Sequence, residues 1–255
     1  ADLFDPAAAS RLPDAANVVF LVGQKFGTSE RPDLTWAANT LIPAHVARRY
    51  AEARIVAFST GCVYPMAPAD SAGSVETDPL EPLGEYANAA VARERVFEYF
   101  SRADGTPMVM FRLNYAVELR YGVLVDLAEM IAAGEPIDVT MGRFNAIWQG
   151  DASAAALRLL ERAACPPPVV NVTGTASLSV REVAKRLAGA MGTKARFAGR
   201  EAPKVLLADA SRMIELLDQP PTPLDRVIDW TADWIARGGR TLGKPTHFQT
   251  RDGRY

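Results

Sequence analysis

Histidine and cysteine often carry metal-ion or nucleophilic chemistry, and this chain has only two of each. His45 and His247 cannot build a multi-histidine metal centre, and they leave two candidates for histidine-dependent proton transfer. Cys62 and Cys165 lack the CxxC spacing of a structural zinc site and cannot form a disulfide framework. We therefore expect no metal site, and reduced thiols of this kind indicate a cytoplasmic location.

A tyrosine at the start of a helix and a polar strand end are the next candidates for chemistry. The segment STGCVYP (59–65) follows the apolar run RIVAFS, which is typical of a buried strand. The segment ETDPLEPLGEYANAAVARE (76–94) then passes from a proline-rich loop into a helical pattern that includes Tyr86. Taken alone, Tyr86 is an ordinary amphipathic residue and Thr60 an ordinary loop hydroxyl, so the interpretation depends on the whole pattern.

The whole pattern resembles the extended short-chain dehydrogenase/reductase family, also called the NAD-dependent epimerase/dehydratase family. In that family a strand ends in S-[ST]-x-x-V-Y-G, and a loop E-x-x-P-x-x-P leads into Y-x-x-x-K-x-x-x-E on a helix. The segments VVFLVG, FRLNY, VVNVTG and LSVREVAKRL are also similar to family segments, so the likeness covers almost the whole chain. The resemblance implies an α/β fold, with a Rossmann-like doubly wound parallel sheet and a small α+β C-terminal substrate lobe.

The resemblance also implies the chemistry and the residues that perform it. Tyr86 would exchange a proton with a substrate hydroxyl while NAD or NADP exchanges a hydride, and Thr60 would orient the reacting oxygen. The family lysine, one helical turn after the tyrosine, favours the tyrosinate and also contacts the cofactor ribose. The cofactor-binding residues implied by the resemblance are Asp2, Leu3, Leu21, Val22, Gly23, Asn39, Ser59 and Asn114.

The first departure from the family pattern is at position 90, where Ala90 stands in place of the lysine. A tyrosine with the ordinary pKa near 10 is a poor base at neutral pH. Lys25 follows the first strand on the ligand side of a parallel sheet, and we hypothesise that it supplies the missing charge, with Arg120 as a second candidate. If Lys25 is instead a solvated loop residue, the chain is a catalytically weak or inactive nucleotide-binding member with a regulatory or scaffold role.

The second departure is at the start of the chain. The family opens with a strand, a G-x-x-G-x-x-G turn and a helix, which seat the cofactor pyrophosphate, and no such motif occurs here. Asp2 and Leu3 match a family pair that ends the third strand beside the adenine. We therefore expect two β–α units, about 60 residues at about 30 per unit, upstream of Ala1, and the sheet to be incomplete without them. The residue that selects NAD or NADP would lie in that segment.

The substrate is expected to be a sugar nucleotide or a sugar-like molecule. Relatives that are sugar-nucleotide 4,6-dehydratases carry T-D-E where this chain has Thr60, Gly61 and Cys62, which argues against that reaction and leaves epimerisation or simple oxidation and reduction. An arginine at position 120 suits an anionic substrate. The expected substrate-binding residues are Cys62, Tyr115, Arg120 and Tyr121.

The elements that position these residues alternate along the first half of the chain. Buried strands are expected at 17–23, 54–59 and 107–113, and helices at 36–52 and 86–100, which predicts βαβ units. The second half favours helices at 122–133, 152–164 and 224–237, a strand at 168–172, and a helix that follows the capping box of Ser179 and Glu182. We expect residues 1–120, with 135–165, to form the nucleotide-binding domain, and 121–134 with 166–255 to form the substrate lobe and tail.

Composition sets the remaining limits. The 255 residues are 49% apolar and 23% charged with a net charge of −2, which excludes a disordered chain and disfavours a nucleic-acid binder. No apolar run approaches the roughly 20 residues that cross a bilayer. A small-molecule substrate is therefore the expected partner, without nucleic acid or membrane. The family resemblance further implies a homodimer formed through the helices at 36–52 and 86–100.

Overall fold

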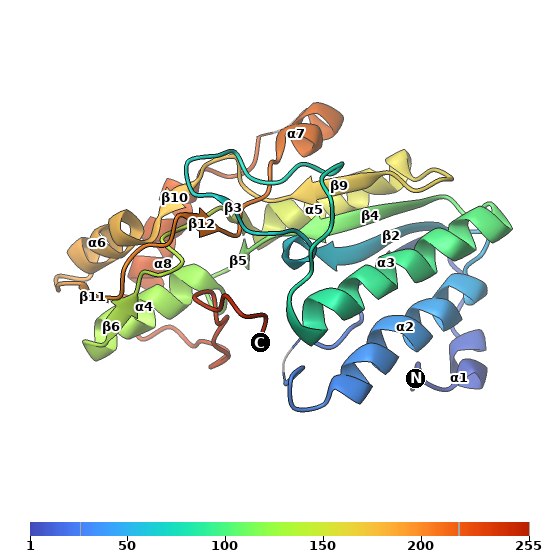
Figure 1. The fold of residues 1–255 in the computed structure, drawn as a ribbon, viewed down its shortest axis with the longest axis horizontal. Coiled ribbons are helices and arrows are strands. Elements are labelled where there is room, and N and C mark those ends of the chain that lie inside the picture. The colour runs from blue at the N-terminus through green and yellow to red at the C-terminus, as the bar shows by residue number, and fades with distance from the viewer. Residues whose placement is uncertain (26, 219, 255) are drawn as a thin grey trace.

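The computed structural model describes residues 1–25, 27–218 and 220–254, and a parallel sheet lies at its centre (Figure 1). In the described ranges this sheet has four strands in the order β1-β2-β4-β9. All neighbouring strands are parallel, with Val19 opposite Val56 and Phe111 opposite Val170. The strands are β1 (Asn17–Phe20), β2 (Arg54–Thr60), β4 (Met108–Leu113) and β9 (Val169–Val172).

Helices cover both faces of this sheet, which confirms the expected doubly wound α/β class. α2 (Pro32–Arg49) and α3 (Gly84–Asp104) lie side by side on one face, and α5 (Gln149–Leu159) lies on the other with α7 (Ser211–Leu217) (Figure 1). Successive strand residues point to opposite faces. On β2, Ile55 accordingly packs with α2 and α3, while Val56 packs in the cluster of α5 and α7.

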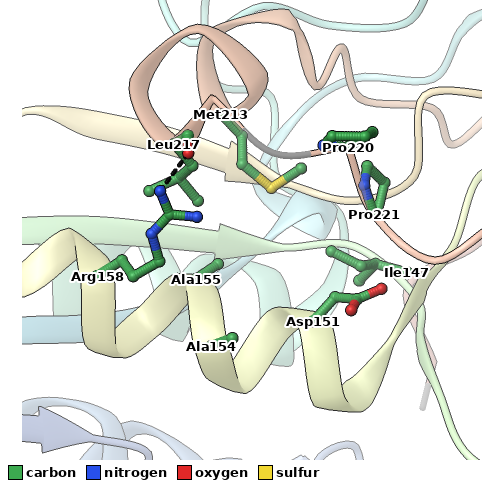
Figure 2. Close-up of a pocket in the computed structure, with 9 residues that line it drawn as sticks. All are labelled: Ile147, Asp151, Ala154, Ala155, Arg158, Met213, Leu217, Pro220 and Pro221. Atoms are coloured by element: carbon green, nitrogen blue, oxygen red, sulfur yellow. Dashed lines mark hydrogen bonds between the residues drawn. The ribbon is translucent and has the colours of Figure 1, made fainter.

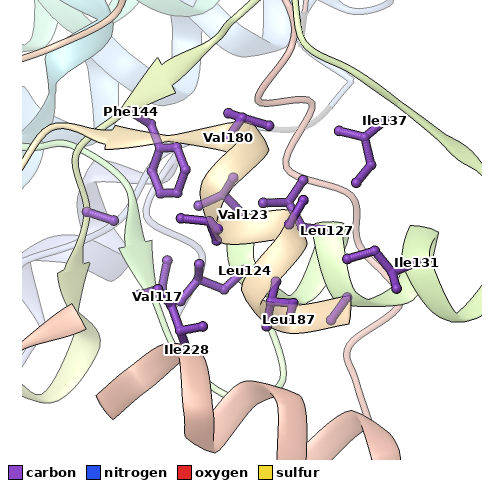
Figure 3. Close-up of a cluster of buried hydrophobic side chains, with 14 of the residues drawn as sticks. Val117, Val123, Leu124, Leu127, Ile131, Ile137, Phe144, Val180, Leu187 and Ile228 are labelled. Atoms are coloured by element: carbon purple, nitrogen blue, oxygen red, sulfur yellow. The ribbon is translucent and has the colours of Figure 1, made fainter. Parts of the chain in front are cut away.

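A second hydrophobic core holds the C-terminal lobe together. α4 (Val123–Ala133), α6 (Val180–Ala190) and α8 (Leu224–Ala236) pack around it, and Figure 3 shows one side chain of the core from each helix: Leu127, Leu187 and Ile228. α6 begins at the expected cap, where the Ser179 hydroxyl accepts a hydrogen bond from the Glu182 amide at 3.4 Å. In each of these helices, apolar residues recur every three or four positions and bury one face against this core.

Short strands and turns connect the sheet with the lobe. Four strand pairs are β5 (Ala116–Val117) with β8 (Ile147–Trp148), β6 (Pro136–Asp138) with β11 (Arg196–Ala198), β7 (Arg143–Phe144) with β10 (Leu178–Ser179), and β3 (Ala67–Pro68) with β12 (Lys204–Val205). The remaining helical turns are α1 (Pro6–Ser10), η1 (Gly61–Val63) and η2 (Leu160–Arg162).

The observed contacts differ in two places from the sequence-based division into domains. β9 pairs with β4 in the central sheet, although residues 166–255 were expected in the lobe. β6 pairs with β11 in the lobe, although residues 135–165 were expected to serve the nucleotide-binding domain. A short β-branched run has the same pattern in either sheet, so only the tertiary pairing decides where it belongs. In the described ranges, no helix is both long and apolar enough to cross a membrane.

Candidate active site

A cavity of about 190 Å³ lies where β2 and β4 end and the lobe begins. The carboxyl ends of parallel strands are the usual ligand side of such sheets. Thr60 ends β2 and caps the turn η1, because its hydroxyl accepts a hydrogen bond from the Cys62 amide at 3.2 Å. Of the predicted site residues, those lining the cavity are Lys25, Ser59, Thr60, Cys62, Tyr86, Asn114, Tyr115 and Tyr121.

Tyr86 enters this cavity from the first turn of α3. The helix begins at Gly84, whose φ of +75° favours glycine, and the phenol of Tyr86 is hydrogen-bonded with the Thr60 hydroxyl. Burial raises the pKa of Tyr86 above its usual value and Cys62 adds to this, while Lys25, Arg93 and the Thr60 hydrogen bond act in the opposite direction. The phenol is therefore protonated at neutral pH, in the form that can donate a proton.

Lys25 stands on the lobe side of the same cavity. Its amine donates a hydrogen bond to the Tyr121 hydroxyl at 2.9 Å and lies 5.4 Å from the centre of the Tyr121 ring. Burial lowers the pKa of Lys25, but the hydroxyls of Tyr86 and Tyr121 outweigh it, and the net pKa lies above the usual value. The structure thus brings a charged amine into electrostatic range of Tyr86.

A buried ion-pair network reaches the cavity at Ser59. The Glu94 carboxylate on α3 accepts hydrogen bonds from Arg112 Nε at 2.9 Å, from another Arg112 nitrogen at 2.7 Å, and from the Ser59 hydroxyl. Arg112 also donates to the Tyr64 hydroxyl at 2.7 Å, and that hydroxyl donates to Asn171 at 2.8 Å. The network ties α3 to β2, β4 and β9, and it fixes Ser59 beside Thr60.

Other predicted site residues lie outside the cavity. Arg120 is exposed and pairs with Glu118 at 3.0 Å, so the second candidate for the missing charge faces solvent. Asp2 is exposed, and the carbonyl of Leu3 lies 2.9 Å from His45 Nδ1. Leu21 and Val22 are exposed after β1, while Gly23 and Asn39 surround the side chain of Arg93.

Asn114 and Tyr115 take different roles at the end of β4. The Asn114 amide donates a hydrogen bond to Asn145 at 2.8 Å and is buried, which anchors the strand end to the lobe. Tyr115 has a φ of +44°, a left-handed conformation unusual for an aromatic residue, and its hydroxyl donates to the Phe248 carbonyl at 3.4 Å. Burial raises the pKa of Tyr115. Tyr115 therefore lines the cavity from a backbone conformation that is uncommon for its residue type.

The C-terminal tail closes the cavity with residues that sequence reasoning missed. Thr246 and Phe248 line it, and Asp126 on α4 holds Thr246 through the Thr246 amide at 2.8 Å and the Thr246 hydroxyl. Further along, the backbone of Gly253 lies against Gly84, so closely that a side chain at Gly84 would collide with it. The tail is polar and glycine-rich, and nothing in its sequence signals a site. Other missed lining residues are Leu113, Ala116, Val123 and Leu206.

A smaller hollow of about 30 Å³ lies between α5 and the segment that carries α7 (Figure 2). The helix expected from residue 152 begins earlier, at Gln149. Asp151 therefore lies within its first turn, and the Asp151 carboxylate accepts hydrogen bonds from the amide and hydroxyl of Thr222, at 2.6 Å and 3.1 Å. Arg158 donates to the Leu217 carbonyl (Figure 2). These polar groups anchor the segment after α7 and have a structural role. In the described part of the chain, no group of three histidine, cysteine or acidic side chains could hold a metal ion.

The parallel sheet, the helices on both faces and the cavity at the strand ends define a Rossmann-like α/β protein with a C-terminal lobe. The model of the NAD dependent epimerase/dehydratase family matches residues 1–173, and the chain belongs to that family. No curated protein matches it.

Three solved structures illustrate the similarity in fold. UDP-glucuronic acid 4-epimerase from Bacillus cereus in complex with NAD is 17% identical, with a TM-score of 0.78, over 93% of this chain and 79% of that chain. RMD from Pseudomonas aeruginosa complexed with NADPH is 20% identical, with a TM-score of 0.78, over 92% and 87%. A UDP-galactose 4-epimerase is 20% identical, with a TM-score of 0.74, over 93% and 82%. These likenesses confirm the Rossmann-like fold.

Proposed function

We propose that this chain is an NAD(P)-dependent epimerase or oxidoreductase that acts on a hydroxyl or carbonyl of a sugar-nucleotide or sugar-like substrate. The observation that carries the proposal is the convergence of Tyr86, Thr60 and Lys25 on one cavity at the strand ends. Membership of the family supports it, as do similar folds that were solved with NAD, NADPH or UDP sugars.

The residues after β1 fit a dinucleotide. Leu21 and Val22 expose apolar side chains, Gly23 lies against the Arg93 guanidinium, and the buried Arg93 Nε has no hydrogen-bond partner among the described residues. We assign cofactor contacts to these residues and to Asn39 and Ser59, while contacts from Asp2, Leu3 and Asn114 stay predictions. When bound, the nicotinamide would accept or supply the hydride.

The protein's own residues would move and hold the proton. Tyr86 is protonated at neutral pH, so it is ready to donate to a substrate oxygen, and Thr60 shares a hydrogen bond with it and orients that oxygen. In the reverse direction the tyrosinate must form, and the Lys25 charge stabilises it. We place the substrate against Cys62, Tyr115 and Tyr121. A contact from Arg120 requires the substrate to extend beyond the cavity to the surface beside Glu118.

The test uses a panel of nucleotide sugars and polyols, with nicotinamide absorbance to detect net oxidation or reduction and chromatography of the products to detect epimerisation, which leaves the cofactor unchanged overall. We expect Tyr86→Phe to reduce turnover by about 10²- to 10⁴-fold, the usual contribution of general acid–base catalysis. Tyr99→Phe is a matched control, because Tyr99 lies on the same helix and is 65% exposed. Full activity of Tyr86→Phe would refute the assigned role.

A second candidate function is a nucleotide-binding member without catalysis. Ala90 in place of the lysine favours it, and so does the raised pKa of Tyr86, because both disfavour the tyrosinate. Tight NAD(P) binding by the wild-type chain without turnover of any substrate in the panel would support this candidate over the enzyme.

We also propose a homodimer formed through α2 and α3. Apolar side chains on these adjacent helices are exposed, including Trp36, Leu41 and Tyr99. Light scattering should give a mass near twice that of one chain, and the mass of a single chain would contradict the proposal. The cytoplasmic location stays a prediction.

A further inference from the structure

Arg93 is a buried cation that the family pattern does not account for. It follows Tyr86 by seven residues, nearly two helical turns, so both side chains leave α3 from one stripe. Long side chains on a helix lean toward its N-terminus, which directs the guanidinium of Arg93 back toward Tyr86. The charge of Arg93 and the phenol of Tyr86 interact electrostatically.

The guanidinium of Arg93 is fixed at the carboxyl end of β1. One terminal nitrogen donates to the Phe58 carbonyl at 2.7 Å, and the other donates to the Asn39 side chain. A Cβ at Gly23 would collide with the guanidinium, so the absence of a side chain there makes room for it. Arg93 therefore lies across bare backbone at the edge where we place the cofactor.

This charge lacks a counter-ion among the described residues. Arg93 is 7% exposed, its Nε has no hydrogen-bond partner, and it forms no ion pair in that part of the chain. The adjacent Glu94 is already bound to Arg112. Burying a charge is costly unless it is paired, so an unpaired buried guanidinium indicates a ligand with oxygen acceptors.

Position 90 cannot provide this charge, because Ala90 packs in an apolar cluster with Val63 and Tyr64. We propose that Arg93 is the cofactor-side cation of the site and donates hydrogen bonds to the hydroxyl oxygens of the nicotinamide ribose. The two roles that the resemblance gives to one lysine are then divided: Lys25 acts on Tyr86 from the substrate side, and Arg93 binds the ribose. This inference rests on the proposed cofactor.

Two ligands separate ribose recognition from the rest of the site. ADP-ribose carries the second ribose and ADP does not, so their affinities, measured by calorimetry, isolate the contact. We expect Arg93→Gln to weaken ADP-ribose binding at least tenfold, as a lost hydrogen bond from a charged group does, and to change ADP binding less than twofold. Arg95→Gln is the matched control, because Arg95 lies on the same helix, is 62% exposed and should change neither affinity.

The outcomes distinguish this inference from the proposed function. Suppose that the wild-type chain binds ADP-ribose. The ribose contact is then refuted, while the proposed function stands, if Arg93→Gln keeps the wild-type affinity for ADP-ribose or if its affinities for ADP and ADP-ribose fall by the same factor. If the wild-type chain binds neither ADP-ribose nor NAD(P), both fail together. Should Arg93→Gln not fold, Arg93→Lys keeps the charge without the planar fork. It should lose several-fold affinity for ADP-ribose alone, and an unchanged affinity would overturn the inference.

Discussion

Replacing Glu94 by glutamine should be among the most destabilising single changes in the central sheet and the helices that cover it. Its carboxylate accepts two hydrogen bonds from Arg112 and one from Ser59, and the Arg112 and Glu94 side chains are 5% and 4% exposed. Glutamine keeps one acceptor oxygen and turns an NH₂ donor toward the other donors. Arg112 then stays buried without a counter-charge, which costs about 3–5 kcal/mol.

That cost is large against the total stability of a domain, about 5–15 kcal/mol. At about 2–4 °C per kcal/mol for a chain of this size, Tm should fall by about 6–20 °C. Urea unfolding followed by circular dichroism measures the free energy directly. Glu98→Gln is the matched control, because Glu98 pairs with exposed arginines on the same helix and should cost less than about 1 kcal/mol.

A double-mutant cycle decides whether the ion pair is the cause. Arg112→Met alone also leaves one buried charge, whereas Glu94→Gln with Arg112→Met removes both charges. The double variant should therefore be more stable than the sum of the two single effects predicts, by about 1–3 kcal/mol. A loss below about 1 kcal/mol for Glu94→Gln, or strict additivity, would refute the reasoning.

Two further changes test the electrostatics of the site and the tail. Lys25→Met should raise the pKa of Tyr86 further, because Lys25 is one of the groups that lower it. Ultraviolet titration measures this pKa when each protein is compared with the same protein carrying Tyr86→Phe. An unchanged pKa of Tyr86 in Lys25→Met would exclude Lys25 as the replacement charge. Burial raises the folded pKa of Asp126 despite hydrogen bonds from Thr246, so ionisation of Asp126 weakens the fold as pH rises above about 3.8. Asp126→Asn should therefore gain unfolding free energy relative to wild type between about pH 3 and pH 7, and a pH-independent difference would contradict the sign.

The central sheet and its two long helices were predictable from sequence because their signals are local. Strand β2 (Arg54–Thr60) is a continuous apolar run buried on both faces, and α3 (Gly84–Asp104) follows the motif around Tyr86. The placement of β9 was not predictable, since the run VVNV fits either sheet until β4 pairs with it. The helix α7 was missed because its seven residues give too few turns for a periodic pattern.

The candidate cavity was predictable where its residues follow a strand or begin a helix. Thr60, Tyr86 and Lys25 line one cavity, as their positions at strand and helix ends suggested. Thr246 and Phe248 were not predictable, because about 160 residues separate them from Tyr86 and their place depends on how the tail packs against Asp126. Arg93 was visible as a cation two turns after Tyr86, but burial is what distinguishes it from exposed Arg95.

Positions 90 and 93 differ in where their backbones lie on α3, but a cation is useful to the site according to where its charged group lies. An arginine side chain spans more than one helical turn, so a cation can reach the same edge of a sheet from several positions on one helix stripe. The guanidinium of Arg93 needs space at the edge of the sheet. Gly23 provides that space, because a side chain at this position would displace the guanidinium. The glycine that follows β1 and the arginine on α3 thus depend on each other. The loss of the lysine at position 90 is therefore compatible with a cationic cofactor site. Among the described residues the Arg93 Nε has no hydrogen-bond partner, and a bound ribose would supply one.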